Sequence, residues 1–247
     1  MDIGGLIRQH APRVALQFSG GRDSLAMLLL LREWWPLLTV YYTNSGDPYP
    51  ETTALIDRVR AAVPSFVDIQ GDMPETVKRH GWPSDAMQAG AGWPYGAQQI
   101  AGHLPLIDRH ACCYHSIMLP MHERMQRDGI TLLLRGQRDD DEPKSHVRSG
   151  ETHDGMTIVY PLVDWSAAQV DDYIRSEGME PPPYYAEGAT SAPDCMRCTA
   201  WLEHGALAYL RRHHPATAAV VSDRLRQIKV AVAPHMARID AALEEHA

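Results

Sequence analysis

The sequence predicts an α/β fold with a mostly parallel sheet, because a strand, a glycine turn and a helix follow one another near its start. Arg13–Phe18 is a short β-type run, a Ser-Gly-Gly turn follows it, and the apolar stretch Leu25–Leu31 is too long for an ordinary strand. A second apolar run, Leu37–Thr43, again precedes a helical pattern, which begins near Leu55. Strands that alternate with helices in this way form parallel sheets covered by helices.

The middle of the chain continues this alternation. Asp72 and Glu75 have the spacing of a capping box and predict a short helix. Four more segments are expected: a strand over Ser65–Ile69, a long irregular segment over Gly81–Gly102, a helix over Ile107–Arg127 and a strand over Ile130–Leu134. Long irregular segments in compact domains are usually functional.

The last third of the chain is expected to be mainly helical. Thr157–Tyr160 reads as one more strand, and Ser166 with Gln169 forms a capping box for a helix that runs to about Glu177, before three successive prolines. The final segments predict two helices: Trp201–Arg212, and Ala216 to about Glu245.

Length and charge restrict the class of protein. The 247 residues suit one large domain, so we expect residues 1–180 to form the main domain and 181–247 a helical C-terminal lobe within one structural unit. The net charge of −8 disfavours general nucleic-acid binding, although an acceptor of that class is not excluded. The sequence contains no basic leader and no membrane-spanning run, which predicts a cytoplasmic protein without membrane contact.

A glycine loop is the strongest functional motif. The loop lies where a strand passes into a helix, and it consists of Ser19, Gly20, Gly21, Arg22, Asp23 and Ser24. Backbone N–H groups converge at such a position and favour the binding of a phosphate. The glycines allow an anion to approach the backbone, and the serine hydroxyls can donate hydrogen bonds to it. Asp23 can hold Mg²⁺ against the phosphates, and Arg22 can reach one of them. The simpler alternative is a glycine turn without a ligand.

The loop resembles the SGGxDS loop of the PP-loop superfamily, in which it cradles the pyrophosphate of ATP. Further segments, in the same order, resemble blocks of the phosphoadenosine and adenosine phosphosulfate reductase family: residues 44–52 (NSGDPYPET), Cys112-Cys113, Gly136-Gln137-Arg138-Asp139, residues 161–166 (PLVDWS) and residues 195–199 (CMRCT). The resemblance extends from Val14 to about Trp201. It implies a three-layer sandwich of the adenine nucleotide alpha hydrolase type.

The resemblance also implies which residues meet the nucleotide. Thr43, Asn44 and Gly46 belong to the segment after the second strand, and Arg138 matches the basic position of the family's GxR block. Arg138 and Arg148 flank a charged stretch whose guanidinium groups suit phosphates, although a solvated charged loop explains the same pattern. Asp23 and Arg138 are the expected catalytic residues.

Cysteine spacing points to a metal centre. Cys112 and Cys113 are adjacent, and Cys195 and Cys198 form a Cys-x-x-Cys pair. A similar arrangement in assimilatory adenosine phosphosulfate reductases ligates a [4Fe-4S] cluster, which would use all four thiols. A four-cysteine zinc site and buried cysteines without a ligand remain alternatives.

Three departures separate the chain from the reductases it resembles. Those enzymes use a nucleophilic cysteine near the C-terminus, and no cysteine follows Cys198 here. The family's CCxxxK block has a basic residue where this chain has Ile117. The full SGGxDS loop is typical of members that cleave ATP, and sulfur-inserting proteins of DNA phosphorothioation, which this chain also resembles, combine that loop with an iron-sulfur cluster.

The function expected from these observations is Mg²⁺-assisted adenylation with ATP and pyrophosphate release, coupled to sulfur transfer. The sulfur would come from a partner protein or from the cluster. One alternative is a phosphosulfate reductase that binds a phosphosulfate nucleotide and uses the thiol of a partner protein. Another is a non-catalytic subunit that binds nucleotide and cluster and acts as a sensor.

Overall fold

A computed structural model describes residues 1–86, 104–141 and 145–244 of the chain. Its six-stranded sheet has the order β3-β2-β1-β6-β8-β7, and every neighbouring pair is parallel except β7 with β8. The strands are β1 (Val14–Gln17), β2 (Thr39–Asn44), β3 (Phe66–Gln70), β6 (Leu132–Leu134), β7 (Thr152–His153) and β8 (Met156–Val159). The predicted α/β class with a mostly parallel sheet is confirmed.

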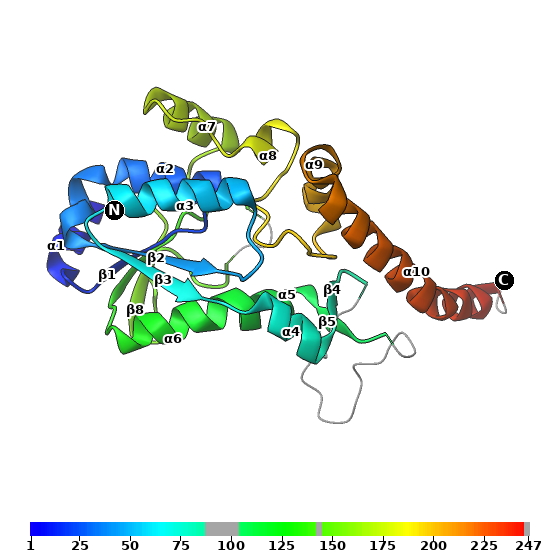
Figure 1. Cartoon of the computed structure of the whole chain (residues 1–247). Coiled ribbons are helices and arrows are strands. Elements are labelled where there is room, and N and C mark those ends of the chain that lie inside the picture. The colour runs from blue at the N-terminus through cyan, green and yellow to red at the C-terminus, as the bar shows by residue number, and fades with distance from the viewer. Residues whose placement is uncertain (87–103, 142–144, 245–247) are drawn as a thin grey trace.

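Helices cover both faces of this sheet (Figure 1). The helices of the main domain are α1 (Ile3–His10), α2 (Arg22–Leu30), α3 (Pro50–Ala62), α4 (Met73–His80), α5 (Arg109–Cys113), α6 (Leu119–Arg127) and α7 (Ala167–Ser176). Two short helical segments join them, a 3-10 helix over Arg32–Leu37 and a π-helical turn over Tyr114–Met118. The expected helix over Ile107–Arg127 is therefore a strand end followed by three helical pieces.

Strand side chains alternate between two hydrophobic cores. Leu16 and Leu134 pack with α2, α3 and α7 in one core, whereas Ala15 and Leu133 pack with Met121 of α6 in the other. This alternation is the period-2 pattern of strands that are buried on both faces. The sheet is thus the middle layer of three, and the carboxyl ends of β1, β2 and β6 share one edge.

A second, two-stranded parallel sheet corrects one prediction. β4 (Trp82–Ser84) pairs with β5 (Leu106–Asp108) inside and just after the segment expected to be irregular. Pro83 is tolerated there because a two-stranded sheet consists of edge strands only. The rest of the expected irregular segment, from residue 87 onward, lies outside the described residues.

The C-terminal part consists of α8 (Pro183–Ala186), a 3-10 turn over Leu202–His204, α9 (Ala206–His213) and α10 (Pro215–Glu244). The helix expected from Trp201 starts only at Ala206, because Trp201 has a left-handed φ of 57°. Tyr49, Tyr184 and Tyr209 form a separate core that joins α9 and α10 to the start of α3. The far end of α10 extends away from the body (Figure 1). Among the described helices, none is long and apolar enough to cross a membrane.

Candidate nucleotide and thiol site

The glycine loop lies at the carboxyl end of β1, and Gly21 begins α2 as its N-terminal cap. Gly21 has no side chain that could cap the helix, and among the described residues the first N–H groups of α2 form only long hydrogen bonds with hydroxyls, 3.3 Å from Gly21 to Ser19 and 3.4 Å from Arg22 to Tyr185, which an anion could replace. Gly20 has a φ of +81°, which favours glycine, and Tyr184 donates a hydrogen bond to its carbonyl oxygen over 3.1 Å. The loop therefore has the strand–turn–helix setting expected from the sequence.

The two serines of the loop are bonded to the loop itself. Ser24 Oγ donates to the carbonyl oxygen of Gly21 at 3.0 Å and lies 3.2 Å from Ser19 Oγ. The backbone N–H of Gly21 donates to Ser19 Oγ over 3.3 Å. These hydroxyls hold the turn in shape, and Ser19 also faces the adjoining cavity.

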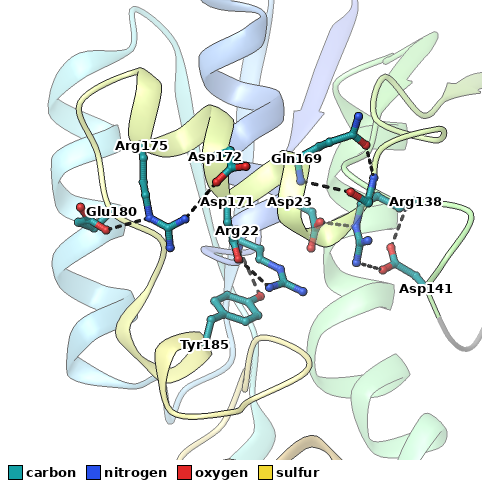
Figure 2. A network of polar contacts seen from close by, with 11 residues as sticks. Arg22, Asp23, Arg138, Asp141, Gln169, Asp171, Asp172, Arg175, Glu180 and Tyr185 are labelled. Atoms are coloured by element: carbon teal, nitrogen blue, oxygen red, sulfur yellow. Dashed lines mark hydrogen bonds and ion pairs between the residues drawn. The ribbon is translucent and has the colours of Figure 1, made fainter.

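Arg22 is held away from the loop by α7 and α8 (Figure 2). Its Nη1 lies 3.3 Å from Asp171 Oδ2, and its guanidinium stacks over the Tyr185 ring at 4.4 Å. The Tyr185 hydroxyl accepts a hydrogen bond of 3.4 Å from the Arg22 backbone N–H. A Cβ placed on Gly21 would meet this hydroxyl at 3.1 Å and Ala192 at 3.0 Å. The segment after α8 thus lies directly over the loop.

Asp23 and Arg138 form a partly buried ion pair (Figure 2). Arg138 Nε donates to Asp23 Oδ1 over 2.6 Å, and its Nη2 donates to Asp141 Oδ1 over 2.7 Å. Burial, together with the repulsion of Asp141, raises the pKa of Asp23 although Arg138 acts in the opposite direction. The structure therefore brings the two expected catalytic residues together, and Arg138, which is buried, is not a solvated side chain.

Gly136, which follows β6, allows the backbone there to come close to the start of α2. A Cβ on Gly136 would lie 2.8 Å from the backbone carbon of Asp23 and 2.9 Å from the backbone nitrogen of Ser24. These are backbone atoms that cannot rotate away, so the position requires glycine for steric reasons. The glycine of the Gly-x-Arg block and the glycine loop are in direct contact.

A cavity of about 310 Å³ opens beside the loop. Its floor includes Gln17, Ser19 and Thr43 at the carboxyl ends of β1 and β2, where open parallel sheets bind ligands. Tyr49 is 1% exposed and lines the same cavity, and the hydroxyls of Thr43 and Tyr49 have no hydrogen-bond partner among the described residues. Buried hydroxyls without a hydrogen-bond partner destabilise the fold, and a polar ligand in this cavity would supply such partners.

The four cysteines are free thiols that line one smaller cavity of about 20 Å³. Cys112 and Cys113 come from α5, and Cys195 and Cys198 come from the segment after α8. Burial raises the pKa of Cys198 to about 12 and also raises the pKa of Cys113 and of Cys195. Three of them also line the larger cavity: Cys113, Cys195 and Cys198.

Within the described ranges, no three His, Cys, Asp or Glu side chains are grouped so that they could hold a metal ion. The two cysteine pairs lie at one cavity, and their role as ligands of a metal or cluster stays a prediction.

Asp47 attaches the second cysteine pair to the end of β2. Its carboxylate pairs with the Arg197 guanidinium, and it accepts a hydrogen bond of 2.8 Å from the Arg197 backbone N–H. Ser45 Oγ donates to the carbonyl oxygen of Asp194 over 2.9 Å. The segment after β2 therefore positions the Cys-x-x-Cys turn beside the 310 Å³ cavity, a role that the sequence analysis did not assign to Asp47.

Other predicted residues lie outside the cavity. Asn44 Oδ1 accepts the N–H of Gly46 at 2.9 Å, and Gly46 turns the chain with a φ of +87°, so both shape the segment after β2. Arg148 is exposed before β7, and in the described part of the chain its backbone N–H donates to Glu151. Its expected phosphate contact stays a prediction.

The glycine loop at the start of α2 and the cavity at the strand ends define a PP-loop type of α/β protein. The chain belongs to the family of the phosphoadenosine phosphosulfate reductase domain, whose model matches residues 13–201. A phosphoadenosine 5′-phosphosulfate reductase of Gloeobacter violaceus is 24% identical over 208 residues, which cover 81% of this chain and 77% of that protein.

Two further comparisons agree with this family. An adenosine 5′-phosphosulfate reductase of Deinococcus radiodurans is 24% identical over 167 residues, and the match spans 67% of this chain and 58% of that protein. The crystal structure of a phosphoadenylyl-sulfate reductase from Candida auris, in a phosphate complex, superposes with a TM-score of 0.52 at 18% identity, covering 74% of this chain and 81% of that chain. The resemblance inferred from the sequence motifs is confirmed at the level of family and fold.

Proposed function

We propose that this protein adenylates an acceptor with ATP, releases pyrophosphate and couples this activation to sulfur transfer. The observation that carries the proposal is the position of the full Ser-Gly-Gly-x-Asp-Ser loop at the start of α2, next to a cavity lined by three thiols. The loop supplies a site for the β- and γ-phosphates, and the cavity supplies room for a reacting group beside the thiols.

The phosphate end of the nucleotide would lie over Gly20 and Gly21. Tyr185 and Ala192 lie over Gly21, so we expect ATP binding to displace the segment that follows α8. Asp23 would exchange its contact with Arg138 for Mg²⁺, because its carboxylate oxygens are the ligands that Mg²⁺ prefers. Arg138, released from Asp23, would then neutralise charge on the phosphates.

In the first step, an oxygen of the acceptor attacks the α-phosphorus of ATP. A new phosphorus–oxygen bond forms, the bond from the α-phosphorus to the bridging oxygen breaks, and pyrophosphate leaves with that electron pair. In the second step, a hydrosulfide equivalent from a sulfur donor forms a bond to the activated atom of the acceptor, and AMP leaves with the acceptor oxygen. Neither step changes the total oxidation state, so no oxidant is required.

A [4Fe-4S] cluster is the cofactor that the four thiols fit best. They line a common cavity, all four can serve as thiolate ligands, and two of them are adjacent in the chain, a spacing that resembles the cluster-binding cysteines of adenosine phosphosulfate reductases. When bound, such a cluster supplies electron transfer or a site for additional sulfide. Cys112, Cys113, Cys195 and Cys198 would hold it.

Pyrophosphate release from ATP by anaerobically prepared protein tests this proposal. We expect release in the wild type and its loss in Asp23→Asn, whereas Asp172→Asn, an exposed change on α7, leaves the rate unchanged. Binding of ATP without any pyrophosphate release, in the presence of candidate acceptors, would instead support a non-catalytic subunit that senses nucleotide.

A second candidate is a phosphosulfate reductase that uses a partner thiol, and membership of the family favours it. The relatives from Gloeobacter violaceus and Deinococcus radiodurans carry the names of such reductases. Sulfite release from a phosphosulfate nucleotide with a protein thiol as reductant distinguishes this candidate. Sulfite formation in the absence of ATP cleavage would replace the adenylation proposal by this one.

A further inference from the structure

A second cavity of about 330 Å³ lies between α6 and the sheet. It adjoins the 310 Å³ cavity beside the glycine loop, which we call the nucleotide cavity. The wall that the two cavities share consists of Gln17, Met118, Met121 and Arg135. The two spaces therefore adjoin at the carboxyl ends of β1 and β6, where a group held in one cavity is close to a group held in the other.

Arg135 is the charged residue of this shared wall. It follows β6, and the group that interacts with its guanidinium is the side chain of Tyr160, a neutral phenol. Among the described residues, no carboxylate forms an ion pair with Arg135, in contrast to Arg22, Arg109 and Arg138, which each contact an aspartate. Dense surroundings lower the pKa of Arg135, which is the effect of removing a cation from water.

Arg135 is partly buried, and a cation that is partly withdrawn from water without a paired anion is stabilised when an anion binds beside it. Bidentate guanidinium pairing with a carboxylate, phosphate or sulfate would relieve it. Gln17 stands on the same wall and offers an amide N–H₂ as a second donor. The shared wall is therefore suited to one anionic group.

The rest of the second cavity is mainly apolar and adaptable. Four methionines line it: Met118, Met121, Met125 and Met156. Thioether side chains accommodate apolar bodies of different shape. The carboxylate of Asp154, which also lines the cavity, is accompanied by His122 and His153, each with Nε2 at 3.4 Å from it. The cavity thus combines one unpaired cation with a thioether-lined space of small-molecule size.

We propose that this second cavity binds the acceptor substrate, a small molecule with an apolar or aromatic body and one anionic group held by Arg135 and Gln17. Its role as the acceptor site rests on the proposed function, because adenylation requires the acceptor to adjoin the nucleotide. Its role as an anion site rests on Arg135 and Gln17 and does not depend on the proposed function. Ile117 lines the nucleotide cavity at the position where the family's CCxxxK block has a basic residue. Arg135 supplies a cation between the two cavities.

Titration calorimetry with benzoate as the probe tests the anion site, using the full chain prepared anaerobically. We expect one benzoate per chain and a loss of affinity of about tenfold or more in Arg135→Gln, since charge-assisted hydrogen bonds are lost. Arg127→Gln removes the same charge from the exposed end of α6 and is expected to bind benzoate like the wild type. Equal affinity in Arg135→Gln and the wild type would overturn the assignment.

A measurement on the wild type covers the case in which Arg135→Gln does not fold. With methyl-labelled methionine, benzoate is expected to shift the NMR signals of Met121 and Met125 and to leave that of the exposed Met236 on α10 unchanged. Shifts that omit the cavity methionines, or no binding of benzoate, would exclude the site. Failure of ATP cleavage with intact benzoate binding would remove the proposed function and keep the anion site.

Discussion

At the scale of single residues, the contact between Asp23 and Arg138 joins the two motifs that carry the proposed chemistry. Arg138 is 6% exposed and divides its donors between Asp23 and Asp141. Burial raises the pKa of Asp23 by more than the charge of Arg138 lowers it, so the net shift is upward. Ionisation of Asp23 therefore costs stability in the ligand-free fold, and perturbed carboxyl groups of this kind are common at functional sites.

Asp23→Asn is expected to abolish pyrophosphate release while the ligand-free protein melts at the same or a higher temperature at neutral pH. A raised pKa in the folded state means that the contribution of Asp23 to stability is fully present below its unfolded pKa and is lost as the pH rises through its folded pKa. The melting temperature of the variant minus that of the wild type should therefore increase from about pH 4 to neutral pH. A difference that falls over this range would contradict the assignment.

Gly136→Ala tests the steric contact between the two motifs. The new methyl group would lie 2.8 Å from the backbone of Asp23, so we expect a loss of about 1–3 kcal/mol in the free energy of unfolding and weaker ATP binding. Gly178→Ala is the control, because its space is open and only its φ of +74° opposes the substitution. Chemical denaturation and ATP titration of both variants provide the measurements. If Gly136→Ala bound ATP as tightly as the wild type, the contact between Gly136 and α2 would have no influence on nucleotide binding.

At the scale of elements, the parts of the fold that sequence predicts well are those with a local chemical cause. The capping box of Ser166 and Gln169 forms as expected, with both reciprocal hydrogen bonds, and Asp72 accepts the N–H of Glu75 at the start of α4. The strand β4 was missed because its pairing with β5 depends on residues far apart in the chain. The π-helical turn at Tyr114–Met118 has no sequence signal of this kind either.

Ser166→Ala is expected to lower the free energy of unfolding by about 1 kcal/mol, because it removes one half of the capping box of α7. Val170 and Ile174 of α7 belong to the core that also contains α2, so the loss should appear in the global transition. Ser176→Ala at the exposed end of the same helix is the control and should leave stability almost unchanged. Equal losses in the two variants, measured by urea denaturation, would show that the cap contributes nothing specific.

At the scale of the whole molecule, the sequence predicts which motifs build the site but not which side chains complete it. The glycine loop, the Gly-x-Arg block and the four cysteines are recognisable because each has a fixed local spacing. Tyr49, Asp47 and Arg135 act through contacts with distant segments, namely the C-terminal core, the Cys-x-x-Cys turn and the second cavity. Such contacts depend on the arrangement of the sheet edges, which a single sequence does not display.

The cysteines connect distant parts of the molecule, so metal content and global stability should change together. We expect anaerobically purified wild-type protein to contain about four irons and four sulfides per chain, and Cys195→Ser to lose most of both. Because the cluster would link α5 to the segment after α8, its removal by a chelator should lower the melting temperature of the wild type. Met236→Ser, which changes an exposed sulfur-containing residue on α10, should keep the metal. Zinc in place of iron would refute the cluster, and full iron content in Cys195→Ser would refute this ligand set.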